Sequence, residues 1–70
     1  MDESWEAVYS TTQNYRAILL KEILFDEDIP AVVVNKQDSS YLSFGEIEVY
    51  VHRDDILRAK LIITKFMADE

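Results

Sequence analysis

The stretch EIEVYVH, residues 46–52, alternates strictly between apolar and polar side chains. Successive side chains of a β-strand point to opposite faces, so this pattern predicts a strand with one face on a core and one face in water. The core face would carry Ile47, Val49 and Val51, and the wet face Glu46, Glu48, Tyr50 and His52. The rest of the chain has to cover the apolar face of this strand.

A second alternating stretch, SWEAVYS at residues 4–10, predicts another strand. Strict alternation would place Trp5, Ala7 and Tyr9 on the same side of it. The overlapping STT, residues 10–12, supplies hydroxyl groups that can cap the free amides of a following helix.

That helix is predicted from Gln13 to about Glu27, where neither Gly nor Pro interrupts good helix formers. Its helical spacing produces two apolar faces instead of one. One face carries Ala17, Leu20, Leu24 and, at its edge, Ile23, and the other carries Tyr15, Ile18 and Phe25. The sequence leaves open which of these faces is buried.

The helix is expected to end in DEDIP, residues 26–30, because Pro30 cannot continue it. Asp28 is expected to take the left-handed conformation that Gly usually provides at this position. The β-branched run from Pro30 to Lys36 predicts a strand with substantial burial, and Gln37 to Gly45 a connecting loop.

A last helix is predicted from Asp54 to about Ala68, with Asp54 as its capping residue. Leu57 and Leu61 lie almost opposite the stripe that should face the core. They form a second, outward apolar ridge. The core-facing stripe contains Ile56, Ala59, Ile62, Ile63, Phe66 and Met67.

The order strand, helix, strand, strand, helix predicts an α+β fold in which residues 1–70 form one small domain. A right-handed crossover would place the third strand between the first two, with both helices on one face of a three-stranded antiparallel sheet. We therefore expect a ferredoxin-like plait lacking its last strand. The first strand would then be an exposed edge, which favours pairing with a second chain. We expect a homodimer, formed either by joining sheets or by packing the spare apolar faces of the helices.

Composition narrows the classes of partner. Seven basic residues stand against fourteen acidic ones, for a net charge of −7, so we expect no nucleic-acid or anionic-membrane partner. The chain has no cysteine, and its longest apolar run, residues 29–34, is far shorter than a membrane helix requires. Met1 is followed by two acidic residues, so we expect no signal peptide and a cytoplasmic location.

Several short elements together resemble one protein family. The elements are VYS, then A..L...L, then a helix end followed by IPA, and finally EVYV..DD...A. The matching positions are Val8, Tyr9, Ser10, Ala17, Leu20, Leu24, Ile29, Pro30, Ala31, Val49, Val51, Asp54, Asp55 and Ala59. From about Trp5 to Phe66 the chain resembles the putative prokaryotic signal transducing protein family, small bacterial domains of unknown function. The resemblance implies a fold similar to the PII-type nitrogen-regulatory proteins. The phosphate-binding loops of those proteins have no counterpart in this sequence, so the resemblance implies no ligand residues here.

Two positions depart from the family pattern. Asp28 stands where the family usually has Gly, and Ile18 and Phe25 stand where exposed helix positions are usually charged. The second departure indicates a partner surface particular to this protein.

No catalytic constellation is predicted. His52-Arg53-Asp54 spells the start of a kinase catalytic loop, but Ala59 stands where the metal-binding Asn is required. The acidic run Asp26 to Asp28 lacks the spacing of a calcium loop. His52 with Glu48 could make a general base and its orienting carboxylate, but no nucleophile accompanies them. We expect no enzyme activity, no cofactor and no metal site.

The leading prediction is a non-enzymatic protein-interaction or regulatory module that acts as a dimer with an unknown protein partner. Its candidate interface residues are Trp5, Tyr9, Ile18, Phe25, Leu57 and Leu61. The alternative is a small-molecule or nucleotide sensor, with a candidate ligand site in the loop at Tyr41 and Phe44.

Overall fold

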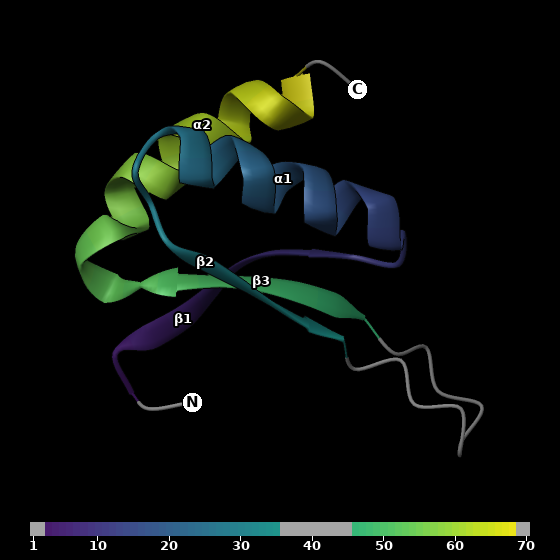
Figure 1. Ribbon diagram of the computed structural model, residues 1–70, viewed down its shortest axis with the longest axis horizontal. Coiled ribbons are helices and arrows are strands. Elements are labelled where there is room, and N and C mark those ends of the chain that lie inside the picture. Colours follow the sequence, from purple (N-terminus) through teal and green to yellow (C-terminus); the bar gives the residue numbers. More distant parts are fainter. Residues whose placement is uncertain (1–2, 36–45, 69–70) are drawn as a thin grey trace.

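The computed structural model describes residues 3–35 and 46–68 (Figure 1). The candidate ligand loop, with Tyr41 and Phe44, lies outside the described residues. Along the chain the elements are β1 (Trp5–Thr11), α1 (Asn14–Asp26), β2 (Ala31–Asn35), β3 (Ile47–His52), a 3₁₀ turn (Arg53–Asp55) and α2 (Ile56–Ala68).

The strands form an antiparallel sheet in the order β1-β3-β2, and Figure 1 shows both helices on the same side of it. This confirms the α+β fold with element order β-α-β-β-α, a ferredoxin-like plait without its last strand. β3 is the central strand, and β1 is an edge strand of the sheet as predicted.

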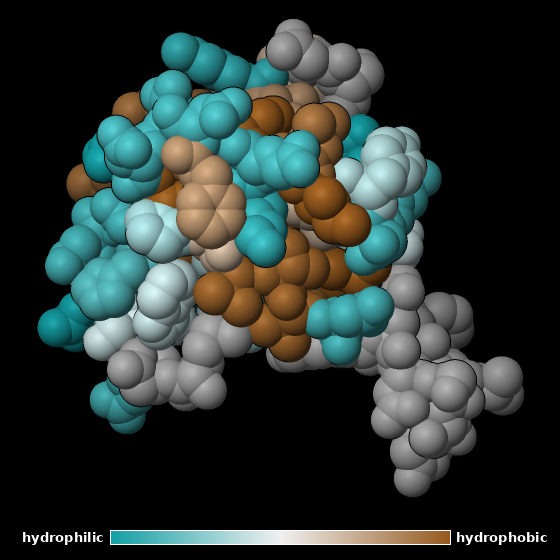
Figure 2. Space-filling view, in the orientation of Figure 1, coloured by the Kyte–Doolittle hydropathy of each residue, from teal (hydrophilic) through white to brown (hydrophobic). Residues whose placement is uncertain are grey.

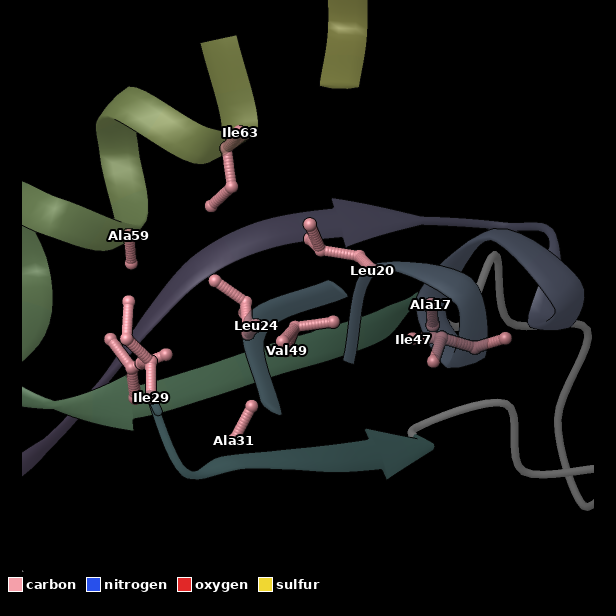
Figure 3. Packing of buried hydrophobic residues seen from close by; sticks show 10 residues of the cluster. Ala17, Leu20, Leu24, Ile29, Ala31, Ile47, Val49, Ala59 and Ile63 are labelled. Carbon is pink, nitrogen blue, oxygen red and sulfur yellow. The ribbon is translucent and has the colours of Figure 1, made fainter. Parts of the chain in front are cut away.

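The core lies between the sheet and the helices (Figure 3). Ile47, Val49 and Val51 of β3 are fully buried, which confirms the alternation predicted for that strand. The helix α1 buries Ala17, Leu20 and Leu24, so its first apolar face is the one that meets the sheet. Ile29, Ala31, Ala59 and Ile63 complete the buried core.

A β-bulge in β1 corrects the predicted alternation of that strand. Ala7 is opposite Tyr50 and Tyr9 is opposite Val49, so Val8 is an extra residue without a partner in the register. Directly paired residues share a face, so Tyr9 shares the core side of the sheet with Val49, whereas Ala7 shares the open side with Tyr50. Trp5 is opposite His52 and belongs to the open side too. Trp5 and Tyr9 therefore do not lie on the same face.

The end of α1 follows the prediction made from Asp28. This residue has a φ of 63°, and its amide donates to the Phe25 carbonyl at 3.0 Å. The next amide, of Ile29, donates to the Leu24 carbonyl at 2.9 Å, and the two side chains are both buried. These bonds and this apolar contact define a Schellman motif, with Asp in place of the usual Gly.

The start of α1 differs from the prediction. The Thr11 hydroxyl accepts from the amide of Gln13 at 3.1 Å, one residue ahead of the helix. Gln13 is the N-cap residue, and its side chain makes no capping hydrogen bond. The Thr11 hydroxyl therefore binds the amide of the N-cap residue itself, ahead of the first-turn amides.

The burial predicted for the second strand is wrong for most of its length. Only Ala31 of β2 is buried, whereas Val32 is exposed and Val33 and Val34 are intermediate. The reason is the topology, because β2 forms the other edge of the sheet and only one of its faces meets the core.

The start of the last helical segment also corrects a prediction. A 3₁₀ turn precedes α2, and its cap is His52, whose Nδ1 accepts from the Asp54 amide at 3.2 Å. Asp54 is therefore not the capping residue. Within α2, Ala59 and Ile63 are buried as expected, but Met67 is half exposed and not part of the core.

The Schellman motif yields a test of the strain at Asp28. Asp28→Gly should raise the free energy of unfolding by about 0.5–1 kcal/mol, because Gly has no Cβ to oppose the left-handed conformation. Glu27→Gly is the matched control, since it also removes one acid but at a φ of −100°. It should lower the free energy of unfolding by about 0.5–1 kcal/mol in urea denaturation. Equal effects of the two substitutions would contradict this account.

Candidate interaction surfaces

The outward side of α1 is unusually apolar. Its exposed large hydrophobic residues retain 44–62% of their accessible surface, and they are Tyr15, Ile18, Leu19 and Phe25. A helix that is apolar on all sides is typical of a helix surrounded by protein. Here the sheet covers only one side, and Figure 2 shows a face of the molecule on which apolar surface gathers between hydrophilic patches.

The helix α2 adds a second apolar feature to the same layer. Leu57 is 80% exposed and Leu61 is 69% exposed, and they lie one turn apart. This places both side chains away from the core, as their spacing predicted. Four of the candidate interface residues, Ile18, Phe25, Leu57 and Leu61, are therefore exposed on the helix layer.

The other two candidate residues lie elsewhere. Tyr9 is half-buried between β1 and the helices, 5.8 Å from the Phe66 ring in an edge-to-face contact. Its hydroxyl accepts from Arg16 Nε at 3.1 Å, and this bond raises the pKa of Arg16 above its ordinary value. The Arg16 guanidinium also lies 5.0 Å from the centre of the Phe66 ring. Tyr9 thus joins β1, α1 and α2 and contributes to the fold more than to a free surface.

Trp5 lies on the open side of the sheet, in an edge-to-face contact with His52 at 5.8 Å. On the same side, the Tyr50 hydroxyl donates to Glu48 Oε1 at 2.9 Å. Within the described residues, no ion pair or hydrogen bond joins Glu48 to His52. The pair of base and orienting carboxylate considered from the sequence is therefore not assembled.

A groove of about 280 Å³ lies between the helices, and sequence reasoning did not identify it. Its lining combines apolar side chains with one acid and one base, namely Ile23, Glu27, Ile62, Lys65 and Phe66. The only signal in the sequence was the position of Ile23 at the edge of an apolar face. The groove depends on how α1 and α2 pack, which helical periodicity alone does not determine.

The acidic run Asp26 to Asp28 spans the last residue of α1 and the Schellman motif, at the end of the helix where the macrodipole disfavours acids. Among the residues that the structure describes, no group of His and acidic side chains is arranged to hold a metal ion. In the same ranges, no helix combines the length and the apolar character needed to cross a membrane.

Residues 5–67 match the family model described as "Putative prokaryotic signal transducing protein". The chain belongs to this family. The match runs from the first residue of β1 into the last turn of α2, so it covers every element of the fold. Comparisons with curated proteins and with solved structures give no match.

The cap at His52 yields a test of what stabilises the start of the last helical segment. His52→Ala should lower the free energy of unfolding by about 1–2 kcal/mol, because the Asp54 amide loses its acceptor and Trp5 loses its ring contact. His52→Asn should recover part of this loss, since Asn also accepts at a cap.

Asp54→Ala is the comparison that separates the two candidate caps. The Asp54 side chain is 80% exposed and lies 3.4 Å from His52 Nδ1, so its loss should change stability by less than about 0.5 kcal/mol. A larger effect at Asp54 than at His52, measured by urea denaturation, would restore Asp54 as the cap.

Proposed function

We propose that this protein is a non-enzymatic protein-interaction module in prokaryotic signal transduction, and that it acts as a dimer with a further protein partner. The observation that carries the proposal is the exposed apolar surface of the helix layer. The family description supports the signalling context.

The energetics of that surface favour a partner. Covering a large apolar side chain that is half exposed contributes on the order of 1 kcal/mol, at about 25 cal/mol per Å². Seven such residues on the two helices are exposed in the single chain, namely Tyr15, Ile18, Leu19, Phe25, Leu57, Leu61 and Met67. Exposed apolar residues gathered on one surface are typical of protein interaction sites in soluble proteins. A domain of 70 residues is also of marginal stability by itself, so association would stabilise it.

The leucine ridge of α2 gives a direct test. Leu57→Glu combined with Leu61→Glu should leave the circular dichroism spectrum nearly unchanged, because both side chains are exposed. The melting temperature should also stay nearly unchanged at concentrations where the natural chain is monomeric. The same change should abolish the dimer mass in multi-angle light scattering and the capture of the partner, because it places charges in the buried interface.

The matched control places the same two charges on the open side of the sheet. Ala7→Glu with Val32→Glu changes two exposed positions opposite Tyr50, and it should leave assembly intact. If the control abolishes assembly and the leucine variant does not, the interface is the open face of the sheet and not the helix layer.

The groove between α1 and α2 supports a second candidate function, a sensor for a small molecule or nucleotide. A volume of about 280 Å³ is just below the usual range for ligand pockets, which suits a small ligand. Glu27 and Lys65 could orient a polar ligand on the apolar wall of the groove. The likeness to PII-type proteins implied by the sequence agrees with such a role.

A thermal-shift screen of nucleotides and metabolites tests this candidate. A ligand at a hundred times its dissociation constant should stabilise the fold by about 2.7 kcal/mol. Ile23→Trp, which fills the groove, should remove that stabilisation. A hit that binds the Ile23→Trp variant equally well would place the ligand elsewhere.

A further inference from the structure

The two helices carry opposite charges on a surface that they share. α2 contains Arg58, Lys60 and Lys65 and no acidic residue. The exposed charges of α1 are Glu22 and Asp26, and two further acids follow its last residue. In a chain with a net charge of −7, this makes α2 a basic helix beside an acidic one.

The basic residues of α1 do not neutralise its acidic side. Arg16 is half-buried against Tyr9 and Phe66, and Lys21 lies over the Phe25 ring at 5.6 Å. In the part of the chain that the structure describes, Glu22, Asp26, Lys60 and Lys65 take part in no ion pair. Arg58 donates to the Glu27 carbonyl at 2.8 Å and lies 3.9 Å from Asp55, so the charges available to a partner are those of Glu22, Asp26, Lys60 and Lys65.

The positions of the acids in α1 also destabilise the helix itself. Glu22 and Asp26 are four residues apart, which brings like charges together on one side of the helix. Asp26 is the last residue of α1, where the macrodipole disfavours an acid. Unfavourable charges of this kind are expected where a site outside the chain compensates for them.

Apolar residues accompany each set of charges. Ile18 and Phe25 are exposed on the acidic helix, and Leu57 and Leu61 are exposed on the basic helix. The helix layer therefore consists of an acidic apolar half beside a basic apolar half. A two-fold axis between the helices would lay each half on the opposite half of a second copy, as an isologous interface requires.

We infer that the helix layer binds a second copy of this chain, with α1 of each protomer packed on α2 of its partner. The inference rests on the proposed function, because it names the surface that forms the proposed dimer. Opposite charges then meet at both ends of the interface, and the exposed apolar side chains are covered between them.

The other occupants fit less well. An anionic membrane or a nucleic acid would meet the acidic half of the surface and a net charge of −7. Pairing of sheets through the edge strand β1 is opposed by the bulge at Val8, since bulges twist an edge away from a flat partner. Only a second copy necessarily carries the matching pattern of charge.

The contact area predicts a weak dimer. Each helix has 13 residues and is about 20 Å long. Two such helices side by side present a face at the small end of specific interfaces, so dissociation constants are expected at micromolar or higher concentration. Sedimentation or light scattering should therefore cover about 10 μM to 1 mM.

Charge reversal in trans tests the inference. Lys60→Glu with Lys65→Glu makes both helices acidic on their outer sides, and Glu22→Lys with Asp26→Lys makes both basic. Each variant alone should dimerise at least about tenfold more weakly than the natural chain, because like charges then face each other. An equimolar mixture should form the heterodimer with affinity near the natural value, because both contacts again join opposite charges.

The control reverses two exposed acids that lie outside both helices, Glu3→Lys with Glu46→Lys, and should dimerise as the natural chain does. Melting temperatures establish that each variant is folded. If a double variant does not fold, the single variants Lys65→Glu and Asp26→Lys, each in its own chain, replace the two double variants.

The two proposals fail in different ways. If the natural chain dimerises and the reversed variants do so equally well, or if their mixture gives no heterodimer, the helix-layer interface is wrong while the dimer stands. A natural chain that remains monomeric at 1 mM, a concentration on the order of the weakest specific contacts, overturns the dimer itself. In that case the proposal of a protein-interaction module is tested separately, by whether the chain captures a protein partner.

Discussion

Burial of one face of β3 is the constraint on which the other elements depend. Ile47, Val49 and Val51 are fully buried, and the strands on both sides of β3 pair with it. A slip of one residue in either pairing would turn Glu48, Tyr50 and His52 toward the core, at the cost of burying polar groups. The register of the sheet and the side on which the helices lie therefore follow from the same alternation.

A single sheet with helices on one side leaves the outer side of those helices without a covering layer. Leu20 and Leu24 meet the sheet, but the same helix also carries Ile18 and Phe25 on its outer side. The fold that satisfies the core thus exposes apolar surface that a larger domain would bury. The proposed interaction module and the proposed dimer both start from this consequence.

Much of the fold could be predicted from local patterns, because the responsible forces act over a few residues. The alternation of β3, the left-handed conformation of Asp28 and the outward direction of Leu57 and Leu61 depend only on strand or helix period and on backbone sterics. Four of the candidate interface residues were found in this way, because an apolar residue outside the core stripe of a helix must point away from it.

The failures have a common physical cause, since each depends on what another segment does. The bulge at Val8 exists only relative to β3, and it separates Trp5 from Tyr9. Choosing His52 over Asp54 as the cap depends on the 3₁₀ turn that follows the strand. Helical periodicity predicted the side of α2 on which Met67 lies. It could not predict that the core ends before Met67 and leaves this side chain half exposed.

The sequence by itself determined the elements, their order, the central position of β3 and the excess of acid, because side-chain period, chain connectivity and composition are local or additive properties. The tertiary structure alone decided which apolar face of α1 is buried and which residues line the groove between the helices. It also decided that an acidic and a basic helix share one surface. These features arise from packing between segments far apart in the chain, where the free energy depends on the fit of whole faces.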